Sequence, residues 1–245
     1  MPKHNPKLKI MKIINPFYDN AFEYMMDNER IAKIVLSIIL DKQVIDLQSK
    51  PQDSHNITIG GLNLVHFEYK AVICSEAGEH KTVLIEVHKY KNIKQIPLYG
   101  DYLEKKFYQE LRAKGRDETA YLPLINIFLL DFDLPETNFR ALRLDNKYYD
   151  VTEGKEINIE SPFLEYMFPQ YYTLITVPKE NLNSHNIQLE KFLNLFTQKL
   201  PNGESNIVID IEVDEAEDAG FKEIVTHLQQ PLLDEELLRK LQIEI

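Results

Sequence analysis

Two stretches of alternating side chains decide how this sequence folds: LVHFEYKAVI at residues 64–73 and TVLIEVHKY at residues 82–90. Apolar and polar residues alternate within each stretch, and this period of two is typical of β-strands. The loop between them is polar and contains Gly78. The sequence therefore predicts an antiparallel hairpin with one apolar face and one polar face.

The expected register of this hairpin places four polar side chains together. A turn centred on residue 77 puts Glu68 opposite Glu86 and His66 opposite His88, because opposed residues lie equally far from the turn. Two carboxylates directly opposite each other on one face repel. A sequence tolerates such a pair when a cation lies between the carboxylates, when one carboxyl is protonated, or when solvent screens the charges.

The first of these explanations predicts a divalent-metal site. Glu68 and Glu86 would supply the hard oxygen ligands that Mg²⁺ or Mn²⁺ takes, with the carbonyl of Val87 as a third ligand and His66 as a further candidate. His88 would bind or orient the attacking water, whose pKa a metal lowers. The alternative is a polar face exposed to solvent, on which Glu, His and Lys are ordinary residues.

The remaining apolar patterns predict an α/β protein with a mixed sheet and helices on its faces, because helix, hairpin, helix and strand follow one another in the first half. Asn15-Pro16 resembles a helix entry, and residues 50–61 are rich in turn formers. Helices are expected at about 29–41, 97–114, 186–198, 214–229 and 233–242, and further strands at 123–130, 141–149 and 171–177.

The net negative charge is concentrated at the C-terminal end of the 245-residue sequence. The net charge is −11, and residues 204–245 hold 12 acids against 3 bases, whereas residues 1–203 hold 27 acids and 25 bases. We therefore expect one large domain over 1–203 and an acidic helical extension over 204–245. The acidic total disfavours strong non-specific nucleic-acid binding but leaves room for a local basic groove.

Several classes of protein are excluded by composition. The apolar runs at 31–40 and 121–130 stop near ten residues, about half of what a membrane span needs. Cys74 is the single cysteine, which excludes an internal disulfide and a cysteine-based zinc cluster. The basic start of the chain lacks an apolar signal region. We expect a cytoplasmic protein with no membrane contact and, since nucleotide and dinucleotide motifs are absent, no small-molecule cofactor.

Basic residues surround the hairpin and the segment after it, interleaved with tyrosines. Such a set suits phosphate contact and base stacking, although it also fits a solvated helix face. The residues are Lys81, Lys89, Lys91, Lys94, Lys105, Lys106, Arg112, Lys114 and Arg116, with Tyr90, Tyr99, Tyr102 and Tyr108.

Stretches that follow one another along residues 13–230 carry a resemblance to a known family. They are NPFYDNAF at 15–22, HFEYKA at 66–71 with KTVLIEVHK at 81–89, PLINIFLLDF at 123–132, and LEKFLNLF at 189–196. In this order they resemble the PD-(D/E)XK nuclease-like family of transposase-associated and recombination-promoting nucleases. The resemblance implies a restriction-endonuclease-like core and metal-dependent cleavage of DNA.

The resemblance also implies roles for single residues. Asp19 matches the acid on the family's first helix, Glu68 the first strand acid, and Glu86 the Glu of E-x-K or E-x-Q. His88 falls where the family has Lys or Gln and would stand in for the residue that activates water. Glu68 replaces the usual Asp, and His66 replaces the usual Arg. Because imidazole suits manganese better than magnesium, we predict a preference for Mn²⁺ over Mg²⁺.

Two functions follow from this resemblance. The first is a metal-dependent DNA endonuclease associated with mobile elements or recombination, with DNA as its partner. The second is a catalytically degenerate protein of the same fold that binds DNA or protein, with the acidic C-terminal helices as a partner surface. Loss of activity and of metal on Glu86→Ala would distinguish the first from the second.

Overall fold

The computed structural model divides the chain into two compact units, which are described separately. Unit 1 comprises Met1–Val44 and Pro178–Ile245, and unit 2 comprises Ile45–Val177. The residues that the structure describes are 8–49, 56–59, 62–74, 78–92, 94–95, 122–132, 141–145, 147–157, 171–176, 186–196, 207–214 and 217–241.

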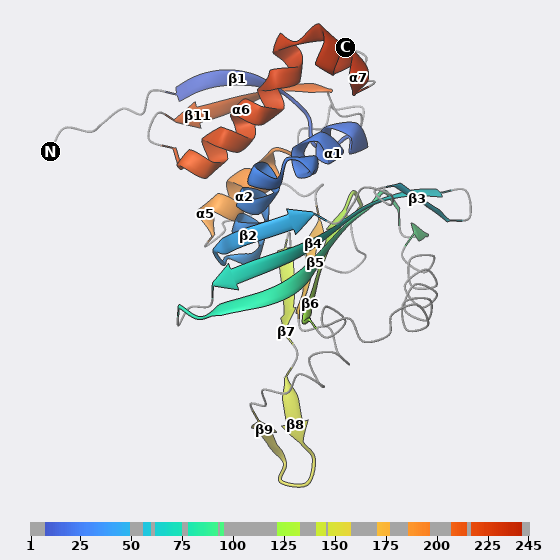
Figure 1. The fold of residues 1–245 in the computed structure, drawn as a ribbon, viewed down its shortest axis with the longest axis vertical. Coiled ribbons are helices and arrows are strands. Elements are labelled where there is room, and N and C mark those ends of the chain that lie inside the picture. Colours follow the sequence, from blue (N-terminus) through green and yellow to red (C-terminus); the bar gives the residue numbers. More distant parts are fainter. Residues whose placement is uncertain are drawn as a thin grey trace, which may run out of the picture. The chain divides into compact units, whose positions relative to one another are not determined.

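Unit 2 is built on a seven-stranded sheet (Figure 1). Its strands run in the order β2-β4-β5-β6-β10-β7, and β3 pairs with β4 beside this path. The strands are β2 (Val44–Ser49), β3 (Asn56–Ile59), β4 (Leu62–Cys74), β5 (His80–Tyr90), β6 (Leu124–Leu130), β7 (Ala141–Asp145) and β10 (Tyr171–Thr176).

The sheet is mixed, as the sequence predicted. β5 pairs with β6, and β6 with β10, in parallel, whereas the pairs β3–β4, β4–β5 and β10–β7 are antiparallel. β4 and β5 form the predicted hairpin, with Glu68 opposite Glu86 and His66 opposite His88. The predicted fold class is thus confirmed at the level of an α/β chain with a mixed sheet.

β5 is covered on both of its faces. It lies between β4 and β6 in the sheet, and every residue from Ile85 to Tyr90 is buried. The expectation of a solvent-exposed polar face is therefore wrong for this strand. The hairpin sequence alone could not reveal this, because the burial of a strand depends on the whole fold.

Two further differences from the expectations lie in unit 2. Residues 50–61, predicted as a break, contain the strand β3. The strand predicted at 141–149 is divided, because β7 ends at Asp145 and β8 (Tyr148–Asp150) pairs instead with β9 (Lys155–Ile157) in a separate hairpin. Figure 1 shows this hairpin as a ribbon beyond the end of β7. The helix predicted at 97–114 lies outside the described residues.

Unit 1 combines a two-stranded sheet with helices. β1 (Leu8–Ile14) pairs antiparallel with β11 (Val208–Asp214), and the helix α6 packs against β1. The helices are α1 (Asp19–Asp27), α2 (Glu29–Leu40), α5 (Ile187–Asn194), α6 (Ala219–Leu233) and α7 (Glu235–Lys240).

The acidic segment after residue 203 is part of this unit rather than an extension from it. β11 was not predicted, yet its alternating sequence VIDIEVD buries Ile209, Ile211 and Val213 and exposes Asp210 and Glu212. The helix predicted from residue 214 begins instead at Ala219, after this strand. The expected domain boundary at residue 203 therefore falls inside unit 1.

The chain enters α1 differently from the expectation. Asn15 does not cap the helix, which begins at Asp19 and has Tyr18 at its N-cap. Instead, the buried Asn15 side-chain oxygen accepts a hydrogen bond of 2.9 Å from the Phe17 amide, which forms a turn ahead of the helix. The second helix agrees with the prediction and is capped by Asn28. Among the described helices, none is long and apolar enough to cross a membrane.

Candidate metal centre

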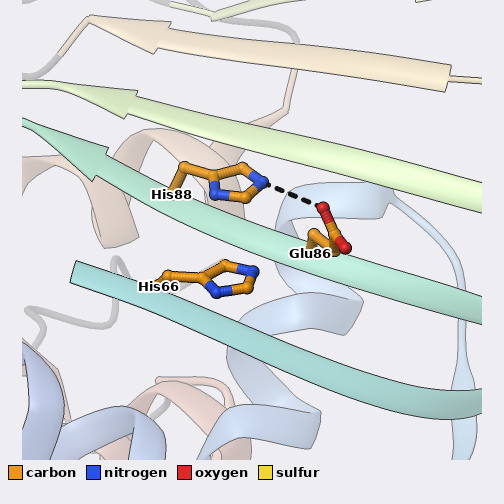
Figure 2. Close-up of side chains that lie close together, drawn as sticks. All are labelled: His66, Glu86 and His88. Atoms are coloured by element: carbon orange, nitrogen blue, oxygen red, sulfur yellow. Dashed lines mark ion pairs between the residues drawn. The ribbon is translucent and has the colours of Figure 1, made fainter. Parts of the chain in front are cut away.

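Three side chains on neighbouring strands of unit 2 converge at one place. Glu86 and His88 project from the same face of β5 because side chains alternate along a strand. The antiparallel register sets His66 of β4 directly opposite His88. Each of the three residues offers one ligand atom, and these atoms lie within 4.8 Å of one another (Figure 2).

The two imidazole rings are stacked and close to the carboxylate. The ring centroids of His66 and His88 are 4.8 Å apart, and the ring planes differ by 4°. His88 Nε2 lies 3.5 Å from Glu86 Oε2, and the dashed line in Figure 2 joins these two atoms. Imidazole nitrogens and a carboxylate oxygen are common ligands of zinc and manganese. This set of donors can hold a divalent cation.

The three side chains are buried, and burial raises the energetic cost of the negative charge on Glu86. His66 and His88 are each 2% exposed and Glu86 is 7% exposed. Removing a carboxylate from water is costly unless a cation or hydrogen-bond donors compensate for the lost solvation. A divalent ion between Glu86 and the two histidines would provide such compensation.

Aromatic side chains form one wall of this centre. The ring of Phe128 on β6 stacks 5.2 Å from that of His88, and the ring of Tyr90 lies 6.3 Å from it. Burial raises the pKa of the Tyr90 hydroxyl, and the nearby Glu86 carboxylate raises it further. Such surroundings have a low effective dielectric constant, so a charge at the centre is weakly screened.

The structure brings some of the predicted residues together and leaves others outside the group. Glu68 stands opposite Glu86 and is half-buried, but it is not among the three converging residues. Val87 pairs with Phe67 on one side and Ile127 on the other, so its carbonyl lies within the plane of the sheet. Asp19, the first residue of α1, belongs to unit 1 and is half-buried.

His88 is the residue whose expected role changes most. The sequence predicted a group that binds, orients or activates the attacking water, whereas the structure places His88 among the possible ligands together with His66. The signal for this was present in the sequence as two histidines opposed across a hairpin. The predicted preference for Mn²⁺ already rested on imidazole ligands.

Lys89 does not contribute to a basic groove. Its side chain is fully buried, and its Nζ lies 3.0 Å from Asp131 Oδ2 in an ion pair. A phosphate cannot reach an ammonium group in this position, so the predicted contact is wrong for Lys89. Lys105, Lys106, Arg112, Lys114 and Arg116, with Tyr99, Tyr102 and Tyr108, lie outside the described residues.

A second place of interest is an open cleft of about 810 Å³ in unit 1. Residues of α2, α5 and the start of α6 line it, including Lys33, Gln188 and Gly220. Its ionic side chains balance in sign: Arg30, Lys33 and Lys42 stand against Asp41, Asp218 and Glu223. Sequence reasoning did not find this cleft because its walls come from distant segments.

Comparison with known proteins leaves the family of the chain open. No family model, no curated protein and no solved structure matches it.

Proposed function

We propose that this protein is a metal-dependent DNA endonuclease whose metal is held by His66, Glu86 and His88. The observation that carries the proposal is the convergence of these three buried side chains within 4.8 Å. Glu86 also fits the resemblance to the PD-(D/E)XK nuclease-like family, which implies a restriction-endonuclease-like core in unit 2, whereas the two histidines replace residues of the family pattern.

The chain's own residues would divide the work. Glu86 supplies the negative charge that holds the cation, and the two histidines supply nitrogen donors that favour Mn²⁺ over Mg²⁺. A metal bound here lowers the pKa of a water molecule and stabilises the charge that develops on a phosphodiester. Glu68, opposite Glu86 and half-buried, would orient that water. In the family that the sequence resembles, an acid on the first helix assists the reaction, and Asp19 matches this acid.

A second function is favoured by the burial of the centre. The exposed fractions of His66, Glu86 and His88 lie between 2% and 7%, so within the described part of the chain little of their surface is open to a phosphodiester. A metal enclosed by protein ligands stabilises a fold instead of catalysing a reaction. Under this second proposal the protein keeps the nuclease fold as a module that binds DNA or protein.

Cleavage of supercoiled plasmid DNA tests the first function. The purified full chain is incubated with Mg²⁺ or with Mn²⁺, beside the variant Glu86→Gln, which keeps the shape of the side chain and removes its charge. Glu79→Gln is the matched control, because Glu79 is an exposed acid next to the turn of the same hairpin. Calorimetric titration of each protein with Mn²⁺ accompanies the assay.

The two measurements together separate the proposals. Metal-dependent nicking that is lost in Glu86→Gln and kept in Glu79→Gln supports the endonuclease. Metal binding without nicking, from protein that is folded by circular dichroism, supports the binding module. If the folded wild-type chain neither binds Mn²⁺ nor cleaves DNA, the metal centre itself is refuted.

A further inference from the structure

We infer that Asn126 is a further ligand of this metal, through its side-chain oxygen. The inference rests on the metal centre of the proposed function and adds a residue from a third strand. Asn126 lies on β6, directly opposite Glu86 in the parallel register, and is 3% exposed. A buried amide needs polar partners, and the side-chain oxygen of Asn126 contacts the His88 ring.

The distances around His88 fit atoms that share a metal ion. Asn126 Oδ1 lies 3.4 Å from His88 Nε2, and Glu86 Oε2 lies 3.5 Å from the same nitrogen. Two ligands bound at about 2.1 Å from a tetrahedral ion are about 3.4 Å apart. A good N–H···O hydrogen bond is shorter, at roughly 2.9–3.0 Å. Both separations are therefore closer to a ligand–ligand distance than to a hydrogen bond.

The chemistry of the atoms supports the same conclusion. A carboxylate oxygen and an amide oxygen, both acceptors, face one ring nitrogen. A single hydrogen on that nitrogen would be shared between two acceptors at long distances. A cation near that position would instead be bound by the nitrogen and by both oxygens. With His66, the ligand set becomes two imidazole nitrogens and two oxygens, a set that suits Zn²⁺ or Mn²⁺.

The competing role for Asn126 is to orient His88 by accepting a hydrogen bond from Nε2. The two roles exclude each other, because a nitrogen that carries a hydrogen in the ring plane cannot bind a metal through the same position. They also predict opposite effects of substitution. Loss of the Asn126 oxygen weakens metal binding if the oxygen is a ligand. It leaves metal binding unchanged or strengthens it if the oxygen only holds a hydrogen on Nε2.

Calorimetric titration of the full chain with Zn²⁺ and with Mn²⁺ tests the inference on two variants. Asn126→Leu keeps the approximate volume and removes the oxygen, so we expect the affinity to fall by at least about tenfold through the loss of a direct ligand. Asn126→Asp keeps the oxygen and adds a charge, so we expect tighter binding. If Asn126 only orients His88, the Asp variant holds the hydrogen on Nε2 and binds metal more weakly.

Ile127→Val is the matched control, because it alters a buried side chain next to Asn126 on β6 without removing an oxygen or nitrogen, and it lies on the opposite face of the strand. Its metal affinity should stay close to that of the wild type. Thermal unfolding without metal establishes that each variant is folded, and if Asn126→Leu does not fold, Asn126→Asp decides. The role of Asn126 is refuted if the wild type binds metal and Asn126→Leu binds it as tightly, or if Asn126→Asp binds it more weakly. Either result leaves the metal centre itself standing. Absence of metal binding by the wild type overturns the metal centre as well.

Discussion

The rings of His66 and His88 stack in parallel, with centroids 4.8 Å apart, across two neighbouring strands of unit 2. The antiparallel register makes the two residues direct partners, and the stack brings a ring nitrogen from each close to the Glu86 carboxylate. Two imidazoles and one carboxylate in a buried position form a set of donors that could hold a metal ion. Its first consequence concerns the choice of metal.

We expect Mn²⁺ to bind more tightly than Mg²⁺, because Mg²⁺ prefers oxygen ligands and the centre offers two nitrogens. The variants His66→Phe and His88→Phe keep an aromatic ring and remove the nitrogens. Each should weaken Mn²⁺ binding by more than about tenfold in calorimetric titrations. His80→Phe is the control, because His80 is an exposed residue of β5, the strand that carries His88. Tighter binding of Mg²⁺ than of Mn²⁺ would contradict this prediction.

Glu68 and Glu86 should destabilise each other in the metal-free protein, because two carboxylates stand directly opposite each other on one face of the hairpin. A double-mutant cycle with Glu68→Gln and Glu86→Gln measures this repulsion in urea unfolding. We expect an unfavourable coupling of about 0.2–1 kcal/mol without metal and a smaller coupling with saturating Mn²⁺. A favourable coupling without metal would show that the two carboxyls share a proton.

Lys89 and Asp131 form a buried ion pair on the other face of β5, with Nζ and Oδ2 3.0 Å apart. Asp131→Asn leaves the ammonium of Lys89 buried without its counter-charge, and we expect a loss of about 3–5 kcal/mol in the free energy of unfolding. The double variant Lys89→Met with Asp131→Asn should be more stable than Asp131→Asn alone. Equal stabilities of the single and double variants would refute a buried charge on Lys89.

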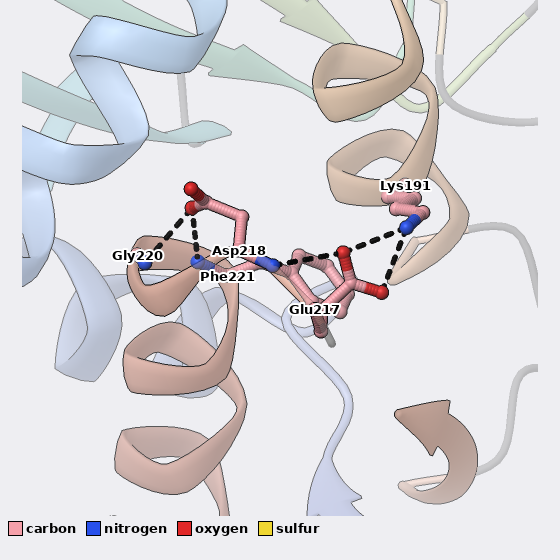
Figure 3. A network of polar contacts seen from close by, with 5 residues as sticks. All are labelled: Lys191, Glu217, Asp218, Gly220 and Phe221. Atoms are coloured by element: carbon pink, nitrogen blue, oxygen red, sulfur yellow. Dashed lines mark hydrogen bonds and ion pairs between the residues drawn. The ribbon is translucent and has the colours of Figure 1, made fainter. Parts of the chain in front are cut away.

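Gly220 is required at the start of α6 because a side chain there has no room. A Cβ at this position would lie 2.9 Å from Ile34 Cγ2 and 3.0 Å from Asp218 Oδ1. Asp218 caps the helix by accepting hydrogen bonds from the amides of Gly220 and Phe221, at 2.8 and 3.2 Å (Figure 3). The capping carboxylate therefore cannot move aside without loss of the cap.

Gly220→Ala should accordingly lower the melting temperature. The gain in helix propensity from Gly to Ala is about 1 kcal/mol, whereas overpacking costs about 1–3 kcal/mol. The cost should shrink in the background Ile34→Leu, which lacks the branch at Cβ. A Gly220→Ala variant more stable than the wild type would show that α2 gives way at this contact.

His227 should make unit 1 less stable in mild acid. Its ring stacks on Tyr24 with centroids 4.3 Å apart, and its Nε2 donates to the Tyr24 carbonyl at 3.2 Å. Burial lowers the pKa of His227, against smaller opposing effects of the hydrogen bonds to Tyr24 and Gln230 and of the Glu223 charge.

The sign of this effect follows from linkage. The unfolded chain binds a proton at His227 near its ordinary pKa of about 6.5, while the folded chain binds it only at lower pH. Stability is therefore complete above about pH 6.5 and decreases as the pH falls through the unfolded value toward the folded one. Urea unfolding between about pH 7.5 and 5 should show this decrease in the wild type and a smaller one in His227→Phe. Identical pH profiles would exclude His227 as the cause.

The sequence by itself determined the hairpin and the pairs across it. Strand alternation and a short polar loop are local properties, so the opposition of Glu68 to Glu86 and of His66 to His88 could be predicted before the rest of the fold was known. The second helix and the buried strand β6 followed from the same kind of local periodicity.

The tertiary structure alone decided what surrounds that hairpin. β6 pairs with β5 in parallel and brings Asn126 to His88 from 38 residues along the chain. β11 pairs with β1 across most of the length of the sequence and draws the acidic segment into unit 1. Such pairings depend on chain segments that are distant in sequence, and periodicity within a short window carries no information about them. For that reason the sequence predicted a polar face, and the fold determined that this face is buried.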